Sequence, residues 1–199
     1  MDIEKHKHIF AELHEHIKQK ADKSLSDLVE HAHKIECFLH TTFVVNNEAT
    51  NDRNPKQLNS LMQPVQNYLR DFIEIVEHLT LWLELQIPSY SDSEDFRIVV
   101  QNEILDDIAS MKAQCIIYMG RFVEYREQRA QANKELFKQP TLDDNYHLIS
   151  NLDHQFHRNL KLMLMELKSY IIRICNLLTK NKDLLERQSF HRQHINNYF

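Results

Sequence analysis

The sequence predicts an all-α protein, an up-down-up-down four-helix bundle of long helices. The chain has 199 residues but only one glycine and four prolines, whereas sheets need many tight turns that use these residues. Apolar side chains recur every three or four residues along four long segments, which is the helical period. Because the connections between consecutive segments are short, neighbouring helices must run antiparallel.

The first helix is expected over about residues 3–40, and a polar stretch over residues 46–55 reads as a loop. The second helix is expected over about residues 56–87, since Pro88 disfavours a helical residue before it. The apolar stripe of the first helix comprises Ile9, Phe10, Leu13, Ile17, Ala21, Leu25, Leu28, His31 or Ala32, Ile35 and Leu39. The heptad seam of the second comprises Leu58, Leu61, Val65, Tyr68, Phe72, Ile75, Leu79 and Trp82.

Pro64 interrupts the second segment early, so its first turns are predicted to kink or to form a separate piece. The third helix is expected over about residues 97–138, where Gly120 suggests close packing against a neighbour. Its seam comprises Ile104, Ile108, Met111, Cys115, Tyr118, Phe122 and Tyr125.

The fourth helix is expected over about residues 142–187, followed by a tail over residues 188–199. Its seam comprises Leu152, Phe156, Leu160, Met163, Leu167, Ile171, Ile174 and Leu178. Because the length fits one domain, residues 1–199 are predicted to form a single four-helix-bundle domain.

Composition narrows the function classes. The net charge of −5 argues against a nucleic-acid-binding protein, which needs a basic surface. No apolar run approaches the roughly 18 residues that span a bilayer, and the first residues lack a signal core, so no membrane is expected as a partner. We therefore expect a cytoplasmic protein, with the nucleus left open. Cys37, Cys115 and Cys175 read as reduced cysteines on helices.

No catalytic or metal-ligating set stands out. A glycine-rich phosphate loop and a nucleophile elbow are both missing from the sequence. A di-metal bundle site needs Glu-x-x-His twice, and the chain carries it once, at Glu30 and His33. The histidines of the first helix (His6, His8, His14, His16, His31 and His33) are interpreted as part of a polar face, and His154 and His157 as surface or interface residues. No enzyme activity, cofactor or metal is predicted.

Two segments are candidates for a functional role beside a purely structural one. The connection between the second and third helices is acidic and then turns apolar at Phe96, Ile98, Val99 and Val100. The alternative is an ordinary connector whose apolar residues open the next helix. Tyr198 and Phe199 follow a polar tail, which could be frayed or could act as a docking peptide for a partner's pocket.

From Arg53 to about Arg187 the chain resembles the 11S proteasome activators, the REG family, without a gap. Each shared motif is weak by itself, but the motifs occur together in order. They are Gln57-Leu58, the run Trp82–Pro88 ending in Ile-Pro, Asp92, Phe96, Gln101, Glu103, Arg129-Ala130, Lys138–Pro140, the run Leu160–Lys168, and Lys180-Asn181. The first helix is similar to that of the family only in the spacing of its apolar residues.

The resemblance implies a heptameric ring whose C-terminal tails dock between α subunits of the 20S proteasome and whose activation loops open its gate. Binding energy alone would drive gate opening. Carried over to this chain, the activation loop comprises Ser91, Asp92, Ser93, Glu94, Asp95, Phe96, Arg97, Ile98 and Val99. The docking tail comprises Asn196, Asn197, Tyr198 and Phe199.

The loop departs from the family pattern, which reads Gly-Asn-Asn-Phe-Gly where this chain has Ser93 to Arg97. Asp95 replaces an asparagine tied to gate opening, and a carboxylate cannot donate the hydrogen bonds of an amide. We therefore expect either weaker activation of the proteasome or a partner proteasome that has changed in step with this loop. The alternative function is a helical scaffold or adaptor without proteasome binding, which would be a monomer or dimer rather than a ring. Whether the ring has one or several kinds of subunit stays open.

Overall fold

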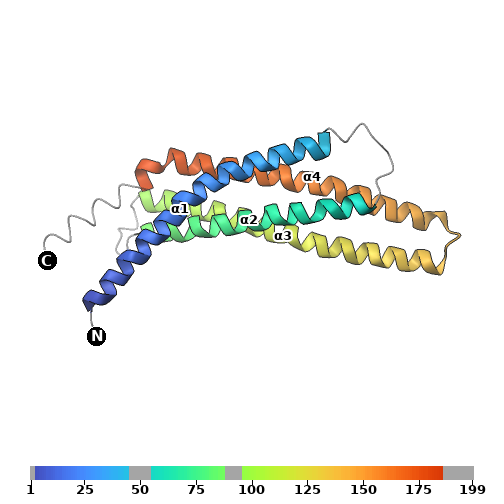
Figure 1. Ribbon diagram of the computed structural model, residues 1–199, viewed down its shortest axis with the longest axis horizontal. Coiled ribbons are helices and arrows are strands. Elements are labelled where there is room, and N and C mark those ends of the chain that lie inside the picture. The colour runs from blue at the N-terminus through green and yellow to red at the C-terminus, as the bar shows by residue number, and fades with distance from the viewer. Residues whose placement is uncertain (1–2, 45–54, 88–95, 186–199) are drawn as a thin grey trace. The chain divides into compact units, whose positions relative to one another are not determined.

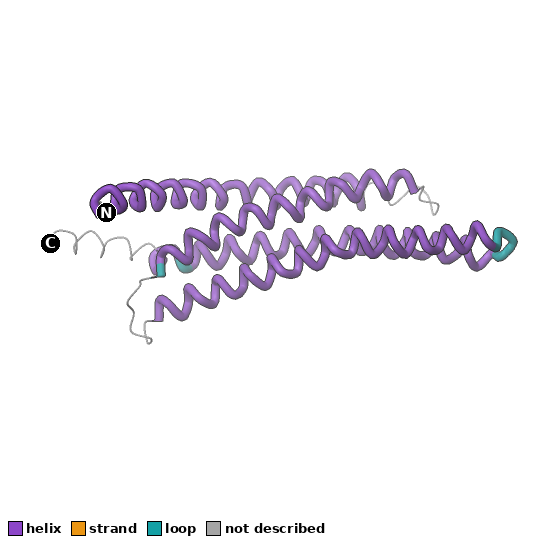
Figure 2. Tube along the Cα trace, turned by 90° about the horizontal axis from the view of Figure 1, so that it is seen from below, coloured by secondary structure: helices purple, strands orange, loops and turns teal. Residues whose placement is uncertain are grey.

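The computed structural model describes residues 3–44, 55–87 and 96–185, and within these ranges every regular element is a helix (Figures 1 and 2). The elements are α1 (Ile3–Leu39), the π-helix η1 (His40–Val44), α2 (Pro55–Gln86), α3 (Phe96–Lys138) and α4 (Asp143–Lys180). The all-α prediction is confirmed.

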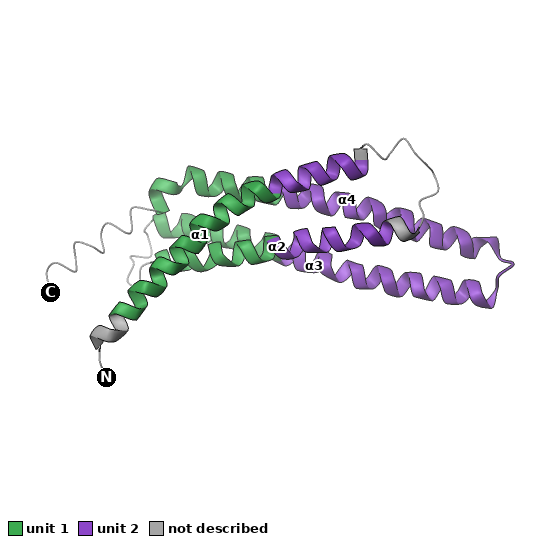
Figure 3. Cartoon of the chain, viewed as in Figure 1, with its two compact units in different colours: residues 1–31, 72–112, 170–199 green, residues 32–71, 113–169 purple. Residues whose placement is uncertain are grey.

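The chain divides into two compact units (Figure 3). Unit 1 comprises Met1–His31, Phe72–Lys112 and Tyr170–Phe199, and unit 2 comprises Ala32–Asp71 and Ala113–Ser169. The helices α1 and α3 pass from unit 1 into unit 2, whereas α2 and α4 pass from unit 2 into unit 1. Consecutive helices therefore alternate in direction, as an up-down-up-down bundle requires. That the whole chain is a single domain stays a prediction.

Each unit has an apolar core to which all four helices contribute. In unit 1 the buried apolar residues are Ile17, Ala21, Leu28, Phe72, Val76, Leu79, Leu83, Ile104, Ile108, Met111, Ile171, Ile174, Leu178 and Leu185. In unit 2 they are Ile35, Leu39, Phe43, Leu58, Met62, Val65, Leu69, Cys115, Tyr118, Phe122, Tyr125, Ala132, Phe156, Leu160, Met163, Leu164 and Leu167. The predicted seam of α3 is buried throughout, and that of α4 is buried from Phe156 onward.

The seam of α2 differs from the prediction by one residue at every second position. Leu58, Val65, Phe72 and Leu79 are buried as expected, but their partners in the core are Met62, Leu69, Val76 and Leu83. The predicted Leu61, Tyr68, Ile75 and Trp82 are only partly buried beside the seam. Adjacent residues on a helix lie about 100° apart, so each of these side chains still borders the core.

Two further expectations are wrong in detail, and one of the two alternatives for Pro64 is excluded. The apolar stripe of α1 is buried only from Ile17, because Ile9, Phe10 and Leu13 are at least half exposed on the first turns of the helix. Pro64 lies inside α2, which continues on both sides of it with Met62 and Val65 in the core, so the first turns are not a separate piece; a kink stays a prediction. The helix α4 ends at Lys180 rather than near Arg187.

The early end of α4 has a local cause. The side-chain amide of Asn181 donates to the carbonyl of Leu177 at 2.8 Å. A short helical turn follows, in which the backbone N–H groups of Leu184 and Leu185 both donate to the carbonyl of Asn181 at 3.0 Å. Asparagine side chains compete with the backbone for such hydrogen bonds, which interrupts helices.

Gly120 does not mark close packing within the chain. A β-carbon built at Gly120 meets no atom within 4 Å, so the glycine carries the entropic penalty of a helix interior without a steric reason. Substitution Gly120→Ala is expected to raise the free energy of unfolding of the single chain by about 0.5–1 kcal/mol. Urea unfolding followed by helical circular dichroism, at a dilution where sedimentation shows single copies, would measure the change. A lower stability of the variant would contradict the open environment of this position.

Candidate functional site

The predicted activation loop is described at its C-terminal flank. Ser91, Asp92, Ser93, Glu94 and Asp95 lie outside the described residues, as do Asn196, Asn197, Tyr198 and Phe199 of the predicted tail. Phe96, Arg97, Ile98 and Val99 form the first turn of α3. The last described residue before the loop is Ile87, which follows α2.

A buried hydrogen bond joins the two helix ends that flank the loop. The last carbonyl groups of a helix have no partner within it, and the N–H of Ile87 turns back to the carbonyl of Glu84 at 3.2 Å. The carbonyl of Leu83 instead accepts a hydrogen bond of 2.5 Å from the side-chain amide of Gln101. Gln101 is 1% exposed. The start of α3 is therefore fixed to the end of α2 by one side chain.

The first turn of α3 presents apolar side chains to solvent. Phe96 is 69% exposed and Val99 is 45% exposed, and residues three apart lie on one face of a helix. Arg97 and Ile98, in the same turn, are partly buried. A rigid support beneath exposed apolar side chains suits contact with a partner protein.

Removing the Gln101 amide tests this support. Gln101→Met keeps the length of the side chain but leaves the Leu83 carbonyl without its donor, so the free energy of unfolding should fall by about 1–3 kcal/mol. Urea unfolding would give the value, and Asn102→Met, at an exposed neighbouring position, is the matched control. Equal stability of the Gln101 and Asn102 variants would show that the buried hydrogen bond contributes nothing.

Ion pairs on the surface of unit 1 link α3 to both of its neighbours. The guanidinium Nη2 of Arg173 on α4 lies 2.8 Å from both carboxylate oxygens of Asp107, and Lys112 Nζ lies 2.8 Å from Glu77 Oε1 on α2. Such exposed pairs contribute about 0–1 kcal/mol each. They join neighbouring helices of unit 1 at the surface and contribute little to its stability.

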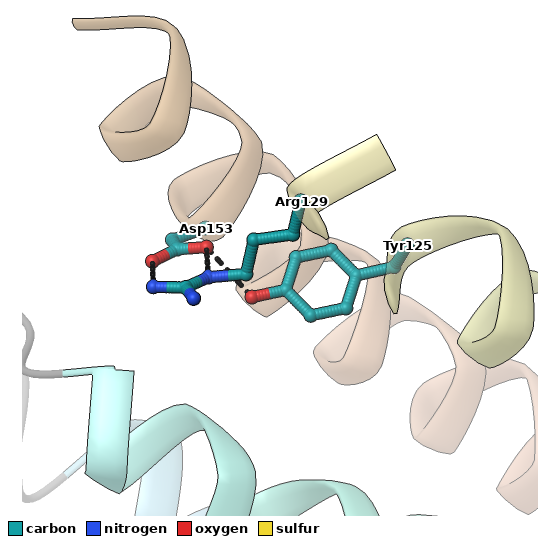
Figure 4. A network of polar contacts seen from close by, with 3 residues as sticks. All are labelled: Tyr125, Arg129 and Asp153. Carbon is teal, nitrogen blue, oxygen red and sulfur yellow. Dashed lines mark hydrogen bonds and ion pairs between the residues drawn. The ribbon is translucent and has the colours of Figure 1, made fainter. Parts of the chain in front are cut away.

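A polar cluster in unit 2 joins α3 to α4 (Figure 4). Asp153 Oδ1 accepts hydrogen bonds from the Tyr125 hydroxyl at 2.6 Å and from Arg129 Nε at 2.8 Å, and Oδ2 accepts one from Arg129 Nη2 at 3.2 Å. The Tyr125 ring stacks on Phe156 with 4.0 Å between ring centroids. Burial, followed by the bond to Asp153, raises the pKa of Tyr125 above its ordinary value, so the hydroxyl keeps its proton and stays a donor. We call this cluster of Tyr125, Arg129 and Asp153 the clamp, because its hydrogen bonds join α3 to α4.

The other candidate groups for chemistry among the described residues are a buried thiol, the Glu30 and His33 pair and the histidines in or beside the core. Burial raises the pKa of the Cys115 thiol to about 12, which makes it a poor nucleophile. Within the described ranges no three histidine, cysteine or acidic side chains gather to hold a metal ion, and Glu30 and His33 are exposed. His31 is buried, and His157 packs against Phe43 with 4.9 Å between ring centroids. None of the described helices is apolar enough over a sufficient length to cross a membrane.

Residues 52–189 match the family described as proteasome activator PA28, C-terminal. The chain belongs to this family. The REG-family prediction is therefore confirmed, and the family is one of regulators rather than of catalytic enzymes.

Curated relatives in the family include proteasome activator complex subunit 3 of Homo sapiens, Mus musculus and Gallus gallus. Each is 22% identical over 132 residues, which cover 66% of this chain and 52% of the relative. The chain thus spans about half the length of the curated relatives it matches.

Solved structures of activators have the same fold. The 11S subunit of the Plasmodium falciparum proteasome, PA28, matches with a TM-score of 0.81 and 19% identity, covering 94% of this chain and 95% of that one. The activator in a complex of the archaeal 20S proteasome with PA26 matches with a TM-score of 0.72 and 14% identity, covering 89% and 94%. PA26 from Trypanosoma brucei, in complex with the yeast 20S proteasome, matches with a TM-score of 0.68 and 16% identity, covering 86% of each chain.

Sequence reasoning missed two features of the site and its scaffold. Gln101 was singled out through the resemblance alone, and its buried hydrogen bond to α2 was not anticipated. Arg129 does leave a signal, because it follows the seam residues Ile108, Cys115 and Phe122 at the same seven-residue spacing. An arginine at a core-facing position needs a charged partner, which the structure identifies as Asp153.

Proposed function

We propose that the chain is a subunit of a non-ATP-dependent proteasome activator. Copies form a heptameric ring that docks on the α ring of the 20S proteasome through the tail Asn196–Phe199. The loop Ser91–Val99 then opens the gate, so that peptides enter and leave more readily. The proposal places the protein in the cytoplasm, with the nucleus left open.

The family match over residues 52–189 carries this proposal. The fold shared with activators that were solved in complex with 20S proteasomes supports it. The described flank of the loop adds local support, because Phe96 and Val99 are exposed while Gln101 fixes the helix end beneath them.

The mechanism needs no bond chemistry. Weak docking of each tail becomes strong when several tails of one ring bind at once, since later contacts form at high effective concentration. A loop that binds the open gate better than the closed gate shifts the population toward the open state. Asp95 replaces an amide donor of the family pattern with an acceptor, so the loop acts through its other contacts or on a partner with a matching donor.

Association with latent 20S proteasome tests the docking step. The full chain is expected to comigrate with the proteasome on a native gel, and a chain lacking Tyr198 and Phe199 should lose at least tenfold in affinity while keeping its helical content. Equal binding by the two chains would remove the tail from the proposal. If neither chain binds, the scaffold or adaptor function becomes the better explanation.

A further inference from the structure

Exposed apolar side chains in unit 2 gather on only two of its four helices. They belong to α3, α4 and the connection between them, and the described α1 and α2 residues of this unit carry none. The set comprises Ile116, Ile117, Val123, Phe137, Leu142, Tyr146, Leu148, Leu162 and Met165. Exposed patches of this kind mark interaction surfaces.

On α3 part of this set forms a second seam outside the core. Ala113, Ile116, Gly120, Val123 and Glu127 follow one another at alternating spacings of three and four residues, and all are exposed. Ile116 and Val123 are each 54% exposed. We call this row the α3 strip. Its average period of 3.5 residues is that of a helix–helix seam, so its occupant should be a helix.

The helix α4 carries a row of the same kind. Arg158, Leu162, Met165 and Ser169 alternate by four and three residues and are exposed, with Leu162 at 58% and Met165 at 46%. We call this row the α4 strip. Large side chains dominate it, whereas the α3 strip has gaps at Ala113 and Gly120. In a helix–helix seam, large side chains of one helix pack into gaps between the side chains of the other.

The two strips lie at the same level of unit 2. Tyr118, between Ile116 and Gly120 along α3, hydrogen-bonds to Glu166, which lies between Met165 and Ser169 on α4. Because α3 and α4 run antiparallel, Glu127 lies toward the same end of unit 2 as Arg158. Neither of these two side chains has an ion-pair partner among the described residues. The strips are therefore complementary in size and in charge.

We propose that the α3 strip of one copy packs against the α4 strip of a second copy. A rotation about an axis along the helices brings the strips together without sliding, because they lie level with each other. The contact is heterologous, since each copy offers a different face to each neighbour, and its repetition by rotation closes a ring. The inference rests on the ring of the proposed function and adds the two faces that build it.

Filling the gap at Gly120 provides the first test. A leucine there has room in the single chain, where a β-carbon meets nothing within 4 Å, but it would occupy the space meant for Leu162 or Met165 of the neighbour. At a concentration where the wild-type chain sediments as an assembly, Gly120→Leu should sediment as single copies with unchanged helicity. Gln128→Leu, which is exposed on another face of α3, is the matched control and should assemble like wild type.

Charge reversal provides the second test. Glu127→Arg and Arg158→Glu should each weaken assembly several-fold, and the double variant should return to within about twofold of wild type. Assembly by Gly120→Leu at wild-type affinity, a wild-type chain that stays a single copy, or a double variant weaker than both single variants would each overturn the inference. Sedimentation needs no proteasome, so strip-dependent assembly without proteasome binding would contradict the proposed function and leave this inference standing.

Discussion

Replacing Phe122 with alanine is expected to lower the free energy of unfolding by about 3–5 kcal/mol, the largest effect of any single change considered. Phe122 is fully buried in unit 2. Its ring meets Phe156 edge to face with 5.5 Å between centroids, a geometry that adds to the energy of burial. Surrounding structure relaxes only partly into the space that a removed ring leaves, so a cavity adds to the lost burial. Urea unfolding followed by circular dichroism at 222 nm would give the difference.

The control for this experiment lies two residues along the same helix. Glu124 is exposed, so Glu124→Ala should change stability by no more than about 0.5 kcal/mol. A loss below about 1 kcal/mol for Phe122→Ala would mean that the aromatic contact between α3 and α4 does not stabilise unit 2.

Replacing Asp153 with alanine is expected to lower the free energy of unfolding by about 2–3 kcal/mol. The Asp153 side chain is 12% exposed, whereas Arg129 is 26% exposed. Without the carboxylate, the guanidinium and the Tyr125 hydroxyl lose the acceptor they share. Arg129 can still reach water, which limits the loss relative to a fully buried ion pair.

Two variants distinguish the contribution of the clamp to stability from that of an ordinary surface ion pair. Asp153→Asn keeps one acceptor oxygen for Tyr125 and should cost less than the alanine variant. Glu135→Ala removes an exposed pair with Lys138 at 3.0 Å on the same helix and should cost no more than about 0.5 kcal/mol. If Asp153→Ala and Glu135→Ala unfold at the same urea concentration, the clamp does not hold α3 to α4.

The helices were predictable because their signals are local. Long apolar periods are interrupted at the polar stretch before Pro55, at Pro88 and at Pro140, and the helix ends follow these interruptions closely. The phase of α2 was not predictable, because apolar doublets fill both alternatives: Leu61-Met62, Tyr68-Leu69, Ile75-Val76 and Trp82-Leu83. Only the position of the other three helices decides which member of each doublet enters the core.

The activation loop and docking tail were predicted from unusual local composition and from resemblance, and not from periodicity. Neither segment follows the spacing of core residues, so the helical period carries no information about the role proposed for it. The Gln101–Leu83 and Arg129–Asp153 contacts join residues 18 and 24 positions apart on different helices, and such pairings depend on how helices pack. The strips on α3 and α4 were likewise hidden, because a second seam becomes visible only when the first is known to be buried.

Hydrolysis of a short fluorogenic peptide by latent 20S proteasome from the same organism, without nucleotide, tests the central claim most directly. Adding the chain should raise the rate several-fold and to saturation, and the chain lacking Tyr198 and Phe199 should leave the rate at its basal value. Binding without stimulation would keep the docking step and would point to Asp95 and Arg97 in an inactive loop. A basal rate at every concentration, with no binding on a native gel, would contradict the assignment of this chain as a proteasome activator.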